Sequence, residues 1–249
     1  MARRTYRRLF REDDLTHFQV KVKETDLCIS VRVERFHPDL VWLVEKTVKE
    51  ARARLEAYIE RDPVFLKTLE PHRVFPDAPA IAAAMADAAA KANVGPMAAV
   101  AGAFADLVGR LLARYSRDVI VENGGDIYLK STRKRRVGIF AGTSPLSNRV
   151  ALEIPPEQTP LGVCTSSGTV GHSLSLGRAD AAVILAPSAT LADAVATATG
   201  NLVQTAADIE KALAFAGSIS GVTGAVVVTG EHIGAWGKVK LVPAALPAT

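Results

Sequence analysis

The feature that most restricts how this chain can fold is an alanine-rich, apolar stretch at residues 78–113. Gly95-Pro96 divides the stretch, which predicts two helices near 78–92 and 96–115. Four charged residues interrupt the apolar run: Asp87, Lys91, Asp106 and Arg110. We therefore expect no membrane-spanning helix here, and no membrane partner. Helices this apolar and this rich in small side chains are expected to be buried, closely packed and surrounded by other elements.

Alternating apolar residues predict strands on either side of these helices. Residues 18–33 have the pattern of a hairpin around Lys-Glu-Thr-Asp, and residues 39–61 have helical spacing that ends at Asp62-Pro63. Further strands are expected near 118–122, 126–130, 136–141, 148–154, 161–166 and 179–186, helices near 188–203 and 205–217, and a closing hairpin from 225–229 and 238–242. No repeat or linker marks a domain boundary. The sequence thus predicts one α+β domain over 1–249, with mixed or antiparallel sheets packed around the alanine-rich central helices.

Composition limits the cellular setting and the partners. The chain has 249 residues, a net charge of +4 and two basic runs, Arg3–Arg8 and Lys130–Arg136. Such runs are either solvated strand ends or a surface for anionic ligands, and the lack of aromatic residues in the second run argues against a nucleic-acid partner. Two cysteines are too few for a disulfide framework, and no apolar segment follows the basic start. We therefore predict a cytoplasmic protein.

Asn93-Val94-Gly95-Pro96-Met97 is the first candidate for ligand chemistry. Pro96 suits the first turn of a helix, and Asn93 could act near a helix cap. The free backbone amides of such a helix start bind phosphate well. The alternative is a tight connection between two core helices.

Glu122-Asn123-Gly124-Gly125-Asp126 is the second candidate. Between two apolar strands, Asn-Gly predicts a two-residue hairpin turn, because the central positions of that turn need positive φ. Asp126 adds a carboxylate beside a backbone that glycine leaves open to close approach. A plain turn and a ligand-binding turn both remain open.

The third candidate contains Cys164 and His172, separated by small hydroxyl residues and glycines. A Cys–His pair supports nucleophilic or persulfide chemistry if the pKa of the thiol is lowered. A lone cysteine next to Val163 can equally be a small buried hydrophobic residue. A serine hydrolase is disfavoured, because the Gly-x-Ser-x-Gly motif is missing.

The fourth candidate is the predicted helix after Ser188. Asp193, Thr197, Asn201 and Gln204 recur at helical spacing, and this face lacks the lysines and glutamates of an ordinary solvated face. Asp193 and Thr197 lie one turn apart, so their oxygens could share Mg²⁺. No Cys/His cluster has a spacing suited to zinc. This face is therefore expected to line a ligand pocket.

In combination and in this order, the motifs resemble the ApbE-like superfamily, whose best-known members are FAD:protein FMN transferases. The resemblance depends on the Asn-Gly-Gly-Asp turn, Thr165-Ser166-Ser167-Gly168 followed by His172, and the Ala-Thr-x-Ala-Asp-Ala-x-Ala-Thr pattern of residues 189–197. It covers roughly residues 93–203. Asn93–Met97 and Val163–Ser173 together look like a compact prokaryotic branch of that superfamily.

This resemblance implies a site for Mg²⁺ and for FAD, FMN or a similar phosphate-bearing ligand. Asp193 and Thr197 would hold the metal, while His172, Asp126 and Cys164 would be catalytic. The residues that would contact the cofactor are Asn93, Gly95, Met97, Asn123, Gly124, Gly125, Thr165, Ser166, Ser167, Gly168 and Thr190. The long insertion before the family's histidine and the Asp-Pro-x-Thr-Gly stretch after it are missing here. The resemblance thus implies a fold and a nucleotide-sized site more directly than FMN transfer.

A second hypothesis also follows from the resemblance to the compact branch. It implies a role in sulfide assimilation into homocysteine, with Cys164 as a sulfur carrier and a protein partner in sulfur metabolism. A non-catalytic ligand-binding protein is a further alternative. A homodimer is compatible with either reading.

Overall fold

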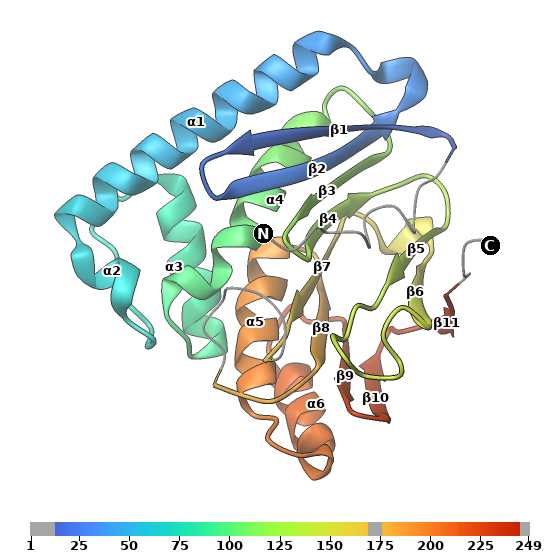
Figure 1. Ribbon diagram of the computed structural model, residues 1–249. Helices are drawn as coiled ribbons and strands as arrows, with labels where there is room; N and C mark the ends of the chain where they lie inside the picture. Colours follow the sequence, from blue (N-terminus) through green and yellow to red (C-terminus); the bar gives the residue numbers. More distant parts are fainter. Residues whose placement is uncertain (1–12, 169–175, 245–249) are drawn as a thin grey trace.

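A large antiparallel sheet runs through the middle of the molecule (Figure 1). The computed structural model describes residues 13–168 and 176–244. The sheet has the order β1-β2-β3-β4-β7-β8-β9-β10, and each neighbouring pair is antiparallel. Its strands are β1 (Leu15–Val22), β2 (Thr25–Arg32), β3 (Val119–Asn123), β4 (Asp126–Lys130), β7 (Leu161–Ser166), β8 (Ala181–Ala186), β9 (Gly224–Thr229) and β10 (His232–Gly237).

The helices cover one face of this sheet (Figure 1). They are α1 (Pro38–Arg61), α2 (Pro63–Lys67), α3 (Ala80–Ala92), α4 (Val100–Leu112), α5 (Ala189–Asn201) and α6 (Ile209–Ser218), with a 3₁₀ turn, η3 (Pro96–Ala99), before α4. The alanine-rich pair α3 and α4 contributes many buried side chains to the core under this layer. The predicted α+β fold with antiparallel sheets is confirmed, and the alanine-rich helices lie in the helical layer on one face of the large sheet.

A smaller antiparallel sheet covers the opposite face of the large sheet. It has the order β11-β6-β5 and consists of β5 (Arg135–Gly138), β6 (Val150–Ile154) and β11 (Leu241–Pro243). Leu152 and Ile154 of β6 pack with Val183 and Leu185 of β8 in a second apolar core. The molecule therefore has three layers, with the helices and the small sheet on opposite sides of the large sheet.

The prediction of the closing hairpin was wrong. Residues 225–229 do form part of β9, but the hairpin partner of β9 is β10, which includes Ile233 and Trp236. The segment near 238–242 continues into β11, which pairs with β6 of the small sheet instead. Most side chains of β10 are exposed, so the strand lacks the alternation of apolar and polar residues that predicts a half-buried strand.

Helix boundaries differ from the predictions at three places. The helix predicted from residue 96 begins as a 3₁₀ turn, and the helix predicted from residue 205 begins with another 3₁₀ turn at Ala206–Asp208. Helix α1 ends at Asp62-Pro63 as predicted, but Pro63 then starts the short helix α2. Proline is well suited to the first position of a helix, so the same residue ends one helix and starts the next.

The second basic run is largely used within the protein. The buried guanidinium of Arg135 forms two hydrogen bonds with the carboxylate of Asp14, both 2.7 Å long. Lys134 and Arg136 lie within 3.2 and 3.9 Å of the Glu153 carboxylate on the small sheet. These contacts agree with the interpretation of the second basic run as charged residues at strand ends.

Among the described helices, none is by itself both long and apolar enough to cross a membrane. Helix α3 and the segment Pro96–Leu112 reach that length and apolarity only as a pair, and the pair is bent by 103°.

Candidate functional site

Helices α4 and α5 cross near Gly102 and cap each other's N-termini. Asp106 lies on one side of the crossing and Asp193 on the other, and these two sides are called the Asp106 end and the Asp193 end of the pair. The candidate site lies at the Asp193 end. A close approach makes the arrangement possible. A Cβ at Gly102 of α4 would lie 2.2 Å from the carbonyl oxygen of Ala189 and 2.8 Å from the Cβ of Asp193, both on α5. Only glycine allows the two helix backbones to come this near.

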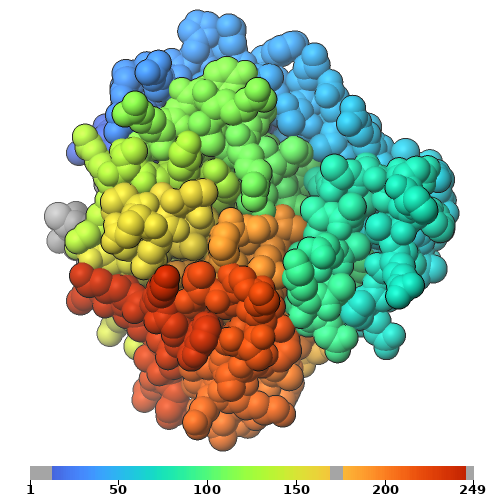
Figure 2. Space-filling view, turned by 180° about the vertical axis from the view of Figure 1, so that it is seen from behind, coloured from blue at the N-terminus to red at the C-terminus, as the bar shows by residue number. Residues whose placement is uncertain are grey.

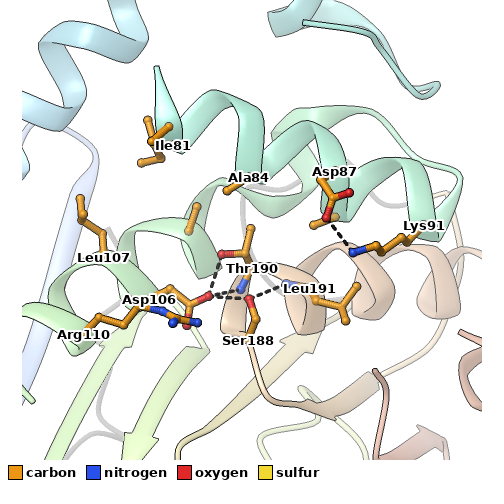
Figure 3. A pocket seen from close by; sticks show the side chains of 13 residues that line it. Ile81, Ala84, Asp87, Lys91, Asp106, Leu107, Arg110, Ser188, Thr190 and Leu191 are labelled. Atoms are coloured by element: carbon orange, nitrogen blue, oxygen red, sulfur yellow. Dashed lines mark hydrogen bonds and ion pairs between the residues drawn. The ribbon is translucent and has the colours of Figure 1, made fainter. Parts of the chain in front are cut away.

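At one end of the pair, Asp106 of α4 caps the start of α5 (Figure 3). Its carboxylate accepts hydrogen bonds from the backbone N–H groups of Ala189 and Thr190, at 3.1 and 3.0 Å. The hydroxyls of Ser188 and Thr190 donate to the same carboxylate, at 2.6 and 2.8 Å. Four donors and the positive end of the helix dipole thus stabilise a buried negative charge. This end of the pair has the features of a structural cap.

At the other end, Asp193 of α5 caps the start of α4. The N–H of Gly102 donates to Asp193 Oδ2 at 2.8 Å. A hydrogen bond from the N–H of Ala101 also favours the charged form of Asp193. These N–H groups belong to the first turn of α4, where the helix itself supplies no acceptor. Asp193 therefore has two backbone donors on one side, and its remaining lone pairs are available for other partners.

A second carboxylate, that of Asp126, lies near Asp193. Asp126 is buried at the first position of β4, directly after the turn formed by Gly124 and Gly125. Those glycines have φ values of 72° and 117°, and Asn123 pairs with Asp126 across the turn. The predicted two-residue turn is confirmed, with Gly124-Gly125 rather than Asn123-Gly124 at its centre. The side-chain amide of Asn123 donates to the carbonyl oxygen of Ala101 at 3.0 Å, which joins the turn to the start of α4.

The two carboxylates repel each other electrostatically. Burial raises the pKa of Asp193 well above its usual range, and the charge of Asp126 raises it further. The hydrogen bonds from Gly102 and Ala101 only partly offset this effect. A pair of carboxylates in this situation is stabilised when a proton or a cation supplies positive charge between them. Thr197 lies one turn after Asp193 on α5, where its hydroxyl can add a third oxygen.

Cys164 lies close to this pair but has the features of a structural cysteine. Its side chain is completely buried, and Sγ donates to the carbonyl oxygen of Ala189 at 3.2 Å. Burial raises the pKa of the thiol well above its usual range, and the charges of Asp126, Asp193 and Asp106 raise it further. A reactive cysteine needs an accessible thiolate and a lowered pKa. The burial of Cys164 therefore favours the alternative of a small buried hydrophobic residue, and its role as a nucleophile or sulfur carrier stays a prediction.

The Asn93–Met97 segment has a different local structure from the one predicted. Asn93 has a φ of 55° and ends α3 in the left-handed conformation, so it is a C-cap. A Cβ at Gly95 would lie 1.9 Å from the carbonyl oxygen of Thr68, which explains the glycine by packing against protein backbone. Met97 is partly buried against the helical core, and its carbonyl oxygen accepts from the N–H of Val100. The alternative of a tight connection is the one observed here.

The Thr165–Gly168 stretch lies at the end of β7. Ser166 is near the C-terminal part of α5, because its Oγ lies 3.6 Å from the position of a Cβ at Gly200. Thr165 and Ser167 are partly buried, and Gly168 is exposed. Thr190, in contrast, is buried and bound to Asp106 at the other end of the helix pair. His172 lies outside the described residues.

The structure thus brings Asp126, Asp193 and Cys164 together around the start of α4. Within 13–168 and 176–244 there is no group of three or more His, Cys, Asp or Glu side chains that could hold a metal ion. A cation here would therefore depend on two carboxylates, the Thr197 hydroxyl and further oxygens from water or ligand, which is a donor set suited to Mg²⁺. The residues fit such an ion, because its charge would relieve the repulsion between the carboxylates. The ligand roles of the individual residues stay predictions.

Two residues that determine how α4 and α5 pack were missed by sequence reasoning. Asp106 was noted only as a charge that interrupts an apolar helix, and Gly102 was not singled out. A carboxylate within a buried alanine-rich helix is itself a signal, because it must find hydrogen-bond donors in the core. Its partners could not be read from the sequence, since Ser188 and Thr190 lie more than 80 residues away in the chain.

Comparison with solved structures identifies the class of fold. The flavin transferase ApbE from Vibrio cholerae matches with a TM-score of 0.53 and 14% identity, over 89% of this chain and 96% of that one. The apo form of the flavinyl transferase ApbE from Pseudomonas stutzeri matches with a TM-score of 0.53 and 17% identity, over 89% and 94%. The chain therefore has the ApbE-like fold.

Sequence comparison then gives the family. The chain belongs to the family described as AbpE bacteria, whose model matches residues 7–234. A UPF0280 protein from Methanosphaerula palustris is 45% identical over 229 residues, which are 90% of each chain. A UPF0280 protein from Methanococcus vannielii is 42% identical over 226 residues, 89% of this chain and 90% of the relative.

Proposed function

We propose that this protein binds a flavin nucleotide together with Mg²⁺ at the Asp126–Asp193 pair. One observation carries the proposal: the buried carboxylate of Asp126 and the partly buried carboxylate of Asp193 lie near each other beside the first turn of α4, and the charge of Asp126 raises the pKa of Asp193. Placing two carboxylates near each other lowers the free energy of unfolding, and a divalent cation bound between them offsets that loss. The shared fold with flavin transferases supports a flavin nucleotide as the phosphate-bearing ligand.

The protein's own residues would act mainly by positioning. Asp193 is fixed by the N–H of Gly102, so its free lone pairs have a set direction. Asn123 holds the β3–β4 turn against the carbonyl oxygen of Ala101, which places Asp126 opposite α5. When bound, Mg²⁺ would neutralise phosphate charge and polarise a phosphoryl oxygen. The reaction that such a site would support is FMN transfer from FAD to a hydroxyl group of a protein: the hydroxyl oxygen would form a phosphoester with the FMN phosphorus, the pyrophosphate bond would break, AMP would leave, and the hydroxyl proton would pass to solvent.

Calorimetric titration of the metal-stripped protein with FAD tests this proposal. We expect FAD to bind in the presence of Mg²⁺ and to bind at least about tenfold more weakly without it, because the metal-free carboxylates would repel the phosphates of FAD and a loss of about 1.4 kcal/mol already corresponds to a tenfold weaker affinity. Asp193→Asn keeps an acceptor for the Gly102 N–H and should remove the dependence on Mg²⁺. Glu60→Gln, an exposed change on α1, is the matched control and should behave like the unmodified protein.

Two results would count against the proposal. One is FAD affinity that does not change with Mg²⁺, and the other is equal Mg²⁺ dependence in Asp193→Asn and in the unmodified protein. FMN transfer is tested separately by chromatography of AMP released from FAD. The assay includes a serine- or threonine-containing protein acceptor, and binding of FAD without AMP release in its presence would reject the transfer reaction and leave the binding proposal in place.

A further inference from the structure

A groove on the helical side of the molecule is separate from the Asp126–Asp193 pair. It has a volume of about 380 Å³ and lies between α3, α4 and the start of α5. Figure 2 shows the face on which these three helices meet, and Figure 3 shows the groove from close by. Asp106 and Thr190 lie along the groove, whereas Asp126, Asp193 and Thr197 do not. A volume of this size is within the range of small-molecule sites, roughly 300–1,000 Å³.

The walls of the groove are mainly aliphatic. Ile81 and Ala84 come from α3, Leu107 comes from α4, and Leu191 comes from the first turn of α5 (Figure 3). Ala84 is exposed although it lies on a helix that otherwise contributes strongly to the core. Small side chains on α3 therefore leave room for an apolar body between the two helices.

The charged groups at the groove differ in whether they already have partners. Lys91 and Asp87 form an ion pair with a 2.7 Å distance between Nζ and Oδ2. The Asp106 carboxylate accepts from four donors at the start of α5. The guanidinium of Arg110, on the last turn of α4, has neither a hydrogen bond nor an ion pair with any residue in the described part of the chain. Within the described residues, Arg110 is thus a cation without a hydrogen-bonded or ion-paired partner, and it lies beside an apolar groove.

We propose that this groove binds a small organic anion with an apolar body. Its carboxylate or phosphate group would bind the guanidinium of Arg110, whose planar fork of N–H donors matches both groups. Its aliphatic or aromatic part would lie between Ala84 and Leu107. The groove and the Asp126–Asp193 pair lie at opposite ends of the α4–α5 pair, so the anion is a second ligand in addition to the flavin nucleotide.

Titration of the full-length protein with octanoate, octyl phosphate and neutral octanol tests this inference, with binding followed by calorimetry. We expect both anions to bind and octanol to bind at least about tenfold more weakly, because octanol lacks the charge-assisted hydrogen bonds to Arg110. The two anionic probes separate a carboxylate site from a phosphate site. Binding by either one supports the proposal.

Three variants locate the site. Arg110→Gln should weaken anion binding about tenfold, and Ala84→Trp, which fills the groove from an exposed position, should abolish it. Arg114→Gln is the matched control, because Arg114 is an exposed arginine one turn later that does not line the groove. Circular dichroism of each variant checks that the fold is kept. The proposal is overturned by a lack of binding of both anions in the unmodified protein, by equal binding of octanol, or by unchanged binding of the anionic probe in Arg110→Gln or in Ala84→Trp.

Discussion

The two ends of the α4–α5 pair use the same residue type for different purposes. Asp106 and Asp193 both cap the N-terminus of the neighbouring helix. Asp106 has two backbone and two hydroxyl donors, which satisfy its charge within the protein. Asp193 has two backbone donors and a second carboxylate nearby, which leaves its charge only partly compensated. A capping carboxylate is therefore structural where the protein supplies all of its hydrogen-bond donors, and it is a candidate ligand site where the protein does not.

The largest expected effect is on stability, at the Asp106 end. Asp106→Ala removes the acceptor for four donors and leaves buried N–H groups unpaired, each of which costs about 1–3 kcal/mol. We expect the free energy of unfolding to fall by about 3 kcal/mol or more, measured by urea denaturation. Asp106→Asn, which keeps one acceptor oxygen, should lose less. A loss below about 1 kcal/mol for Asp106→Ala would show that this end is not a structural cap.

At the Asp193 end we expect a smaller change in the free energy of unfolding, and for Asp193→Asn the change is an increase rather than a decrease. Because the folded protein raises the pKa of Asp193, it holds this proton more tightly than the unfolded chain does. Without metal, stability should therefore fall as the pH rises from about 4, the unfolded value, through the raised pKa of the folded state. Asp193→Asn lacks this titration, so its stability relative to the unmodified protein should increase over the same pH range.

The same stability measurements on the unmodified protein and Asp193→Asn are then repeated with Mg²⁺. At about 100 times its dissociation constant, Mg²⁺ should stabilise the unmodified protein by about 2.7 kcal/mol at pH 8, and by less at pH 5, where protons compete for the carboxylates. Asp193→Asn should show little response. Urea denaturation with and without Mg²⁺ gives both quantities. Equal stabilisation of the unmodified protein and of Asp193→Asn by Mg²⁺ would show that Asp193 does not bind the ion.

The smallest expected effect concerns Cys164, which lies between the two ends and contacts Ala189. In the folded protein, iodoacetamide should label the partly exposed Cys28 at least about tenfold faster than the buried Cys164. In urea the two rates should become similar. Peptide mass spectrometry after timed labelling measures both. Preferential labelling of Cys164 in the folded protein would instead support the sulfur-carrier hypothesis.

Much of the fold could be predicted because its signals are local. The hairpin of β1 and β2, the long helix α1 and the Gly124-Gly125 turn each follow from apolar periodicity or turn chemistry within a few residues. Strand β10 could not be predicted in the same way. Its sequence, His-Ile-Gly-Ala-Trp-Gly, forms an exposed edge of the large sheet and shows no clear alternation.

The site could be predicted only in part, for a related reason. Asp193 and Thr197 share a helix face, so their proximity follows from helical spacing. The effect of Asp126 on Asp193 depends on how β4 packs near α5, and the cap formed by Asp106 depends on a close helix crossing at Gly102. These are contacts between segments far apart in the chain, which local patterns do not specify. The packing of Gly95 against Thr68 belongs to the same class.

Strand β11 has a consequence for the order in which the protein can be completed during synthesis. It pairs with β6, which is made much earlier and lies between β4 and β7 in the chain. While the ribosome is still making α5 and α6, β6 has only β5 as a neighbour, and one edge of this hairpin stays open. The nascent chain therefore carries an unpaired strand edge until its last described strand emerges. Such an edge can form non-native strand pairs with other chains, which leads to aggregation.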